Sequence, residues 1–189
     1  MKSTLKLYFH NGACTDIRKS IELGIADKNI YLLIEQSCGQ IDEIDYFSVA
    51  AIRISQDDYK SAILDYSKAI DINPKFARAY SQRGITRGFN KENPNDVIDD
   101  ISKGIELGDI TSFNYESRAV SYAMLGKFSD ALSDLNKAIE LESKYYITYE
   151  LRGKIKLVTG DVDGACQDWE QALKLGSEIA SKLITEQCK

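Results

Sequence analysis

The chain has 189 residues with a net charge of −5 at pH 7, and 43% of its residues are hydrophobic and 28% charged. This composition is typical of a folded globular chain, and the acidic balance disfavours nucleic acid or an anionic membrane as a partner. No apolar run is long enough to cross a bilayer, and the first residues lack the apolar core of a signal peptide. We therefore expect a cytoplasmic protein, or a periplasmic one if a signal peptide has been removed.

The first 42 residues are irregular. Residues 13–23 have the apolar spacing of the second helix of a helix pair, but its first helix would have to lie in residues 2–9, which is too short. Residues 27–38 have the spacing of an additional helix that stops at Gly39. We expect 1–42 to hold a degenerate half of the repeating unit that follows, together with one extra helix.

From residue 43 onward the sequence repeats itself every 34 residues. Tyr115 aligns with Tyr149 and Arg118 with Arg152 when the chain is shifted by one period. A period of this length is typical of a helix-turn-helix unit stacked on copies of itself. The pattern divides the chain into four units, 43–76, 77–111, 112–145 and 146–179, of which the second has one extra residue in its turn near 90–94.

Each unit is predicted to be a pair of helices. Residues 130–142 carry apolar side chains at three-four spacing, the mark of an amphipathic helix. Gly126 and Gly160 follow the first helices of their units and suit the left-handed conformation found after a helix. Ala131 and Ala138 lie two turns apart on one face, where small side chains let two helices approach closely.

The C-terminal residues 177–189 are predicted to form a capping helix that overlaps the end of the last unit. Ile179, Ala180, Leu183 and Ile184 are expected to face inward. Such a cap is needed because a terminal repeat otherwise leaves its apolar face in water.

The recurring columns resemble the tetratricopeptide repeat. Its pattern of large aromatic, small residue, glycine, alanine, aromatic and alanine appears in the last unit as Tyr149, Gly153, Gly160, Ala165, Trp169 and Ala172. The chain departs from the family in the tyrosine column, which is polar in three units, and in the proline, which three units lack. The resemblance implies an all-α, right-handed superhelical solenoid of antiparallel helix pairs. The closing run 164–189 is also similar to the ends of many bacterial members of the family.

The resemblance also implies where a partner binds, because the first helices of tetratricopeptide units line a concave groove. Phe47 and Ala51 stand where the chaperone-binding members have a lysine–asparagine clamp, so a chaperone's terminal carboxylate is not the expected ligand. The groove residues implied in this way are Phe47, Ala51, Arg78, Ser81, Gln82, Ile85, Phe89, Phe113, Glu116, Val120, Met124, Ile147, Glu150 and Lys154.

Aspartate and arginine each recur once per unit. Because the copies lie a helix pair apart, they indicate a structural ladder of ion pairs rather than one catalytic pocket. We expect pairs between neighbouring units, namely Asp65–Arg83, Asp100–Arg118 and Asp134–Arg152.

The four cysteines include no CxxC pair, so a zinc site is not expected. Cys166 lies ten residues before Gly176 and Cys188 twelve after it, so two helices folded back at this glycine would place both at the same end. They are expected to be neighbours, either as free buried thiols or as a disulfide. A disulfide would indicate an oxidising compartment.

Catalysis is not expected. The sole histidine, His10, lies in the irregular N-terminus, and no glycine-rich phosphate loop is present. The sequence therefore predicts a scaffold without enzyme activity, cofactor or metal, which binds a partner peptide or helix in its groove. The alternative is a structural module that self-associates, for example as a homodimer. A homodimer that fills the groove would favour this alternative.

Overall fold

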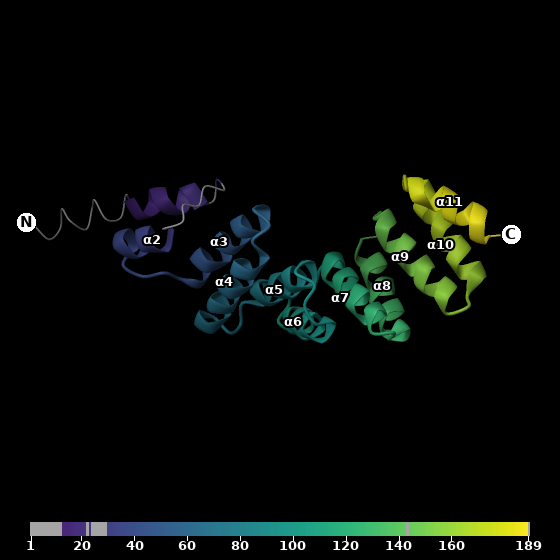
Figure 1. Cartoon of the computed structure of the whole chain (residues 1–189), viewed down its shortest axis with the longest axis horizontal. Coiled ribbons are helices and arrows are strands. Elements are labelled where there is room, and N and C mark those ends of the chain that lie inside the picture. The colour runs from purple at the N-terminus through teal and green to yellow at the C-terminus, as the bar shows by residue number, and fades with distance from the viewer. Residues whose placement is uncertain (1–12, 22, 24–29, 143, 189) are drawn as a thin grey trace, which may run out of the picture.

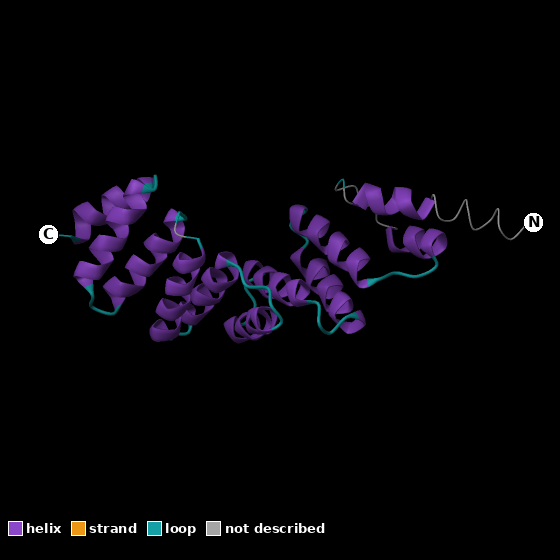
Figure 2. Cartoon of the chain, turned by 180° about the vertical axis from the view of Figure 1, so that it is seen from behind, coloured by secondary structure: helices purple, strands orange, loops and turns teal. Residues whose placement is uncertain are grey.

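The computed structural model describes residues 13–21, 23, 30–142 and 144–188, and within these ranges it contains helices and loops but no strand (Figure 2). Residues 13–21 are helical. The helices that follow are α2 (Ile30–Cys38), α3 (Glu43–Ser55), α4 (Tyr59–Ile72), α5 (Ala77–Phe89), α6 (Pro94–Glu106), α7 (Ser112–Met124), α8 (Phe128–Leu141), α9 (Tyr146–Val158), α10 (Val162–Lys174) and α11 (Glu178–Gln187).

From α3 to α10, each helix packs on the next one along the chain. The helices follow one another along the long axis of the molecule, from α2 near one end to α11 near the other (Figure 1). The architecture is thus an all-α solenoid. The short helix considered within residues 2–9 lies outside the described residues. None of the helices in the described ranges is both long and apolar enough to span a membrane.

The turns inside the units use the left-handed backbone conformation. Gly126 has a φ of 72° and Gly160 a φ of 90°, which confirms the role predicted for these glycines. The equivalent turns of the first two units use Asp57 and Lys91, with φ values of 59° and 58°. Lys91 lies in the turn near residues 90–94, where the extra residue of the second unit was predicted.

Small side chains form the contact between the two helices of a unit. Ala119, Ala131 and Ala138 are all buried. In the last unit, a Cβ atom added to Gly153 would lie 2.5 Å from Nε1 of the fully buried Trp169. The glycine therefore makes room for the largest side chain of the core, because packed interiors leave few voids.

The ion pairs join the two helices of one unit, so the predicted pairing between units is wrong. Arg118 on α7 donates from Nε and Nη2 to both carboxylate oxygens of Asp134 on α8, each at 2.8 Å. The same bidentate contact links Arg83 to Asp100 and Arg152 to Asp168.

The same arginines also make contacts between units, although not the predicted ones. The remaining nitrogen, Nη1, of each of these arginines donates to a side chain of the preceding unit, respectively Ser67, Ser102 and Asn136. The first unit has Val49 in the arginine column, and Arg53, one turn later on α3, donates to Asp65 instead.

The N-terminal helices cover the open face of the first unit. Ile21, Ile30 and Ile34 form one buried cluster with Val49 and Ile52 of α3. Arg18 adds ion pairs to Asp42 at 2.7 Å and to Asp45 at 2.8 Å.

At the other end α11 caps the last unit. Ala180 is fully buried, and Leu183 and Ile184 pack on the core that contains Trp169. Ile179 was expected to face inward, but it is 57% exposed because it lies on the outer side of the helix.

All four cysteines form disulfides. The Cys166–Cys188 bond ties α11 to α10, and a Cys14–Cys38 bond ties residues 13–21 to α2. The neighbour relation predicted for the C-terminal cysteines is confirmed, and of the two states considered it is the disulfide that occurs. The Cys14–Cys38 bond was not predicted.

Candidate functional site

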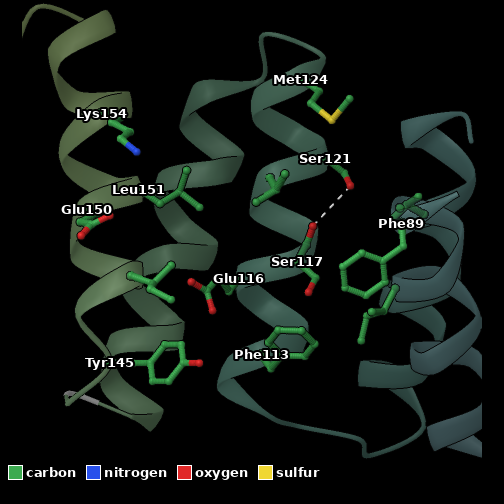
Figure 3. Close-up of a pocket in the computed structure, with 15 residues that line it drawn as sticks. Phe89, Phe113, Glu116, Ser117, Ser121, Met124, Tyr145, Glu150, Leu151 and Lys154 are labelled. Atoms are coloured by element: carbon green, nitrogen blue, oxygen red, sulfur yellow. Dashed lines mark hydrogen bonds between the residues drawn. The ribbon is translucent and has the colours of Figure 1, made fainter. Parts of the chain in front are cut away.

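A pocket of about 500 Å³ lies between the first helices of the second, third and fourth units, α5, α7 and α9 (Figure 3). α7 forms its central wall. The side chains that α7 contributes recur at three-four spacing, which places them on one face of the helix. Thr111 starts this helix, since its side chain accepts a hydrogen bond from the backbone N–H of Asn114.

The walls of the pocket are largely apolar. Met124 is 70% exposed and Phe89 57% exposed, and Phe113, Val120 and Ile147 are also open to solvent. Figure 3 shows Phe89 and Phe113 facing one another across the space between α5 and α7. Apolar side chains gathered on a concave face, rather than scattered singly, are typical of a binding site.

Nine of the fourteen residues implied by the family resemblance line this pocket together. They are Ile85, Phe89, Phe113, Glu116, Val120, Met124, Ile147, Glu150 and Lys154. Among them Ile85 is a buried core residue that contributes only to the floor.

The other five implied residues lie outside the pocket. The ring of Phe47 packs 5.0 Å from that of Phe76, and the guanidinium of Arg78 lies 5.4 Å above the Phe47 ring. Ala51 is exposed and Gln82 is half-buried.

The prediction that Ser81 lines the groove is wrong, because Ser81 is fully buried and accepts a hydrogen bond from the side chain of Asn114 at 3.1 Å. It packs two units together and offers no surface to a partner.

The pocket also contains residues that the family columns did not predict, among them Val97 and Tyr145. Val97 belongs to α6, the second helix of its unit, and Tyr145 lies in the turn that precedes α9. A prediction confined to the first helices cannot include either one. The one sequence feature that could have indicated either residue is the aromatic type of Tyr145 and its position directly before a first helix.

Two carboxylates lie in the apolar lining. Glu116 accepts a hydrogen bond at 3.5 Å from the hydroxyl of Thr148, and Glu150 accepts one from the hydroxyl of Ser177. Both glutamates are buried. Burial raises the pKa of Glu116 above its usual range, because desolvation disfavours the charged form, while the hydrogen bond from Thr148 opposes this shift.

The arrangement suits binding better than chemistry. The described residues that line the pocket include no histidine and no cysteine, and their hydroxyl groups belong to Ser117, Ser121 and Tyr145. Ser121 donates to the backbone carbonyl of Ser117, one turn earlier on the same helix. Across the described ranges, no group of three or more His, Cys, Asp or Glu side chains is placed to hold a metal ion.

Comparison with known proteins agrees with this architecture. A family model described as "TPR repeat" matches residues 51–87. A search of curated proteins gives no significant match. Among solved structures, "MamA 41-end from Desulfovibrio magneticus RS-1" is similar with a TM-score of 0.73 at 11% identity, over 90% of this chain and 94% of that one.

The descriptions of two other similar structures mention peptide binding. YrrB, "a TPR protein with an unusual peptide-binding site", is similar with a TM-score of 0.72 at 12% identity, over 96% of this chain and 90% of that one. The "first TPR of Spaghetti (RPAP3) bound to HSP90 peptide SRMEEVD" has a TM-score of 0.55 at 25% identity, over 59% of this chain and 90% of that one. The repeat period, the stacked helix pairs and these matches agree on the fold: the chain is a solenoid like those of tetratricopeptide repeat proteins, and residues 51–87 match the repeat itself.

Proposed function

We propose that this protein is a non-catalytic interaction scaffold and that the pocket between α5, α7 and α9 holds a peptide or helix of a protein partner. The observation that carries the proposal is the set of exposed apolar side chains, contributed by three successive first helices, around one volume of about 500 Å³. Because these helices are held rigidly by the solenoid, the cost of ordering falls mainly on the partner.

The similar structures support the coarser part of this proposal. Two of the tetratricopeptide proteins named above are described as binding peptides. The HSP90 peptide of one of them is acidic, and the lysine–asparagine clamp expected for such a ligand is absent here because Phe47 and Ala51 occupy its positions. We therefore propose that this protein binds a peptide as those proteins do, but not the acidic HSP90 peptide.

The test is a selection of peptides from a phage-displayed library of random 12-residue sequences on the full-length protein. A Val120→Gln/Met124→Gln variant removes two exposed apolar side chains from the pocket without adding charge. A Leu64→Gln/Leu173→Gln variant is the matched control, because it makes the same change at exposed leucines on the second helices α4 and α10. Ile85 is left unchanged because it is buried in the core.

We expect the pocket variant to bind the selected peptides about tenfold or more weakly than the native protein does. The reason is that burying an apolar side chain contributes about 1.5–3 kcal/mol, and 1.4 kcal/mol is tenfold in affinity. The control variant should bind them like the native protein. Equal weakening by both variants, or by neither, would refute the assignment of the pocket. A dimer in light scattering that the pocket variant dissociates would instead assign the surface to self-association.

We further propose that the protein functions in an oxidising compartment, as the periplasmic alternative requires. Two disulfides support this, because such bonds persist in secreted and periplasmic proteins and are rare in the cytosol. The measurement is the mass of the protein isolated from its natural source and alkylated without reduction. A mass with no alkyl group supports the proposal, and four alkylated cysteines would exclude it. The bacterial source stays a prediction.

A further inference from the structure

The two acidic residues of the pocket occupy equivalent positions in neighbouring units. Glu116 on α7 and Glu150 on α9 are separated by one repeat, and the corresponding positions of the first two units hold Phe47 and Ser81. At this position of the repeat, an acidic side chain is thus present in the third and fourth units and absent from the first two. Figure 3 shows Glu116 projecting from α7 toward α9, in the middle of the pocket.

These glutamates differ from every other buried carboxylate that the structure describes. The five buried aspartates each form an ion pair with an arginine or lysine at 2.9 Å or less: Asp45, Asp65, Asp100, Asp134 and Asp168. Within the described ranges no lysine or arginine lies within 4 Å of the carboxylate of Glu116 or Glu150. The fold supplies a cation to each carboxylate of its ladder and leaves these two without one.

Their hydrogen bonds are few. The described residues supply one donor to Glu116, the Thr148 hydroxyl at 3.5 Å, and one to Glu150, the Ser177 hydroxyl, both of them to Oε1. A carboxylate can accept about four hydrogen bonds, so most of this capacity is unused. Taking such a group out of water is costly unless a donor, and preferably a charged one, is provided.

The surroundings decide what kind of donor fits. Phe113, Val120, Met124 and Ile147 are exposed apolar side chains of the same pocket. Among the lining residues that the structure describes, the only cation is Lys154, which is exposed. A partner segment therefore meets apolar walls with an excess of negative charge between them, and an acidic segment would be repelled.

We propose that the pocket binds a polypeptide segment in which an arginine or lysine, flanked by apolar side chains, reaches the carboxylates of Glu116 and Glu150. This inference rests on the peptide-binding function proposed above and specifies its ligand. The apolar neighbours bury Phe113 and Val120, while the cation supplies the hydrogen bonds that the fold itself does not. Arginine suits the site best, because its planar group can donate to more than one carboxylate oxygen.

The test uses the same phage library, selected in parallel on the native protein, Glu116→Gln and Glu150→Gln. Glutamine keeps the shape and one acceptor of the side chain, so circular dichroism should confirm that both variants fold. We expect arginine or lysine next to apolar residues to be enriched on the native protein. On the variants the apolar preference should remain while the basic preference falls.

A selected peptide then gives the quantitative measurement by calorimetry. Replacing its arginine by citrulline, a neutral group of the same shape, should weaken binding to the native protein by about tenfold or more, since hydrogen bonds to charged groups contribute about 1.5–3 kcal/mol. The same replacement should weaken binding to Glu116→Gln by less than about threefold. Lys154→Gln is the opposite control, and it should leave the effect of citrulline intact and strengthen binding of the arginine peptide.

The outcomes separate the inference from the function on which it rests. Peptides that depend on Val120 and Met124 but show no basic enrichment, or the same enrichment on both glutamine variants, would overturn the inference and leave the peptide-binding pocket standing. Peptides whose binding is unaffected by the Val120→Gln/Met124→Gln variant would overturn both. A second copy of the chain that occupies the pocket would also overturn the inference.

Discussion

The contact between Gly153 and Trp169 allows two opposing effects to be weighed at a single residue. Alanine is more favourable than glycine inside a helix by about 1 kcal/mol. However, the new Cβ would lie 2.5 Å from Nε1, 2.8 Å from Cδ1 and 3.0 Å from Cε2 of a tryptophan that is fully buried. Overpacking of this kind costs about 1–3 kcal/mol, and Trp169 cannot yield easily because its Nε1 donates to the backbone carbonyl of Glu150. Subtracting the gain of about 1 kcal/mol from this cost leaves about 0–2 kcal/mol. Because Trp169 is held in place by its hydrogen bond, we expect Gly153→Ala to fall in the upper half of this range and to destabilise the protein by about 1–2 kcal/mol.

The chain offers a matched control on another first helix. A Cβ added to Gly88 of α5 meets nothing within 4 Å, so Gly88→Ala should be neutral or should stabilise by up to about 1 kcal/mol. Urea unfolding followed by tryptophan fluorescence is the assay, because Trp169 is the one tryptophan of the chain and reports on the last unit. If Gly153→Ala proved as stable as the native protein, the space beside Trp169 would be larger than the structure indicates, and the packing argument would fail.

Three further predictions concern the cap, the ladder and the pocket. Cys188→Ser should lower the unfolding free energy by about 3 kcal/mol in urea, since the bond closes a loop of 22 residues; no change in the midpoint would contradict this. Asp134→Asn should cost about 2–3 kcal/mol, because it leaves Arg118 mostly buried without its partner. Lys137→Ala, at a pair exposed to solvent, should have a much smaller effect, and similar losses in the two variants would refute the ladder's role. Burial raises the pKa of Glu116 in the folded state, so the native protein loses stability as the pH rises through that pKa. Glu116→Gln should therefore be more stable than the native protein at pH 7 and should lose this advantage near pH 4, which thermal melts at the two pH values would measure. An advantage that does not change with pH would exclude the effect.

The repeat and its turns could be predicted because they depend on local pattern. A 34-residue period fixes the helix pairs, and Gly126 and Gly160 mark the turns through their own backbone preference. The pocket followed in part from the same columns. Ser81 was misplaced because one column can face the groove in one unit and the neighbouring unit in another. What decides this is the side chain opposite, here Asn114.

The pairing of the ladder could not be deduced from spacing. Asp65 and Asp100 are almost equally far from Arg83 along the sequence, so the column pattern fits either partner. The choice is made in three dimensions, where the antiparallel helices of one unit place Arg83 directly against Asp100. The Cys14–Cys38 bond was missed for a different reason, since residues 1–42 do not follow the repeat from which positions were deduced.

The arginines of the ladder have a consequence for how the solenoid unfolds. Arg83 on α5 holds Asp100 on α6 and also donates to Ser67 on α4, so one guanidinium joins three consecutive helices. In a linear array of repeats, cooperativity depends on the contacts that cross from one unit to the next. A unit that opens therefore removes a hydrogen bond from its neighbour as well as its own ion pair. This coupling favours a solenoid that melts over several units together rather than one that frays a single unit at a time.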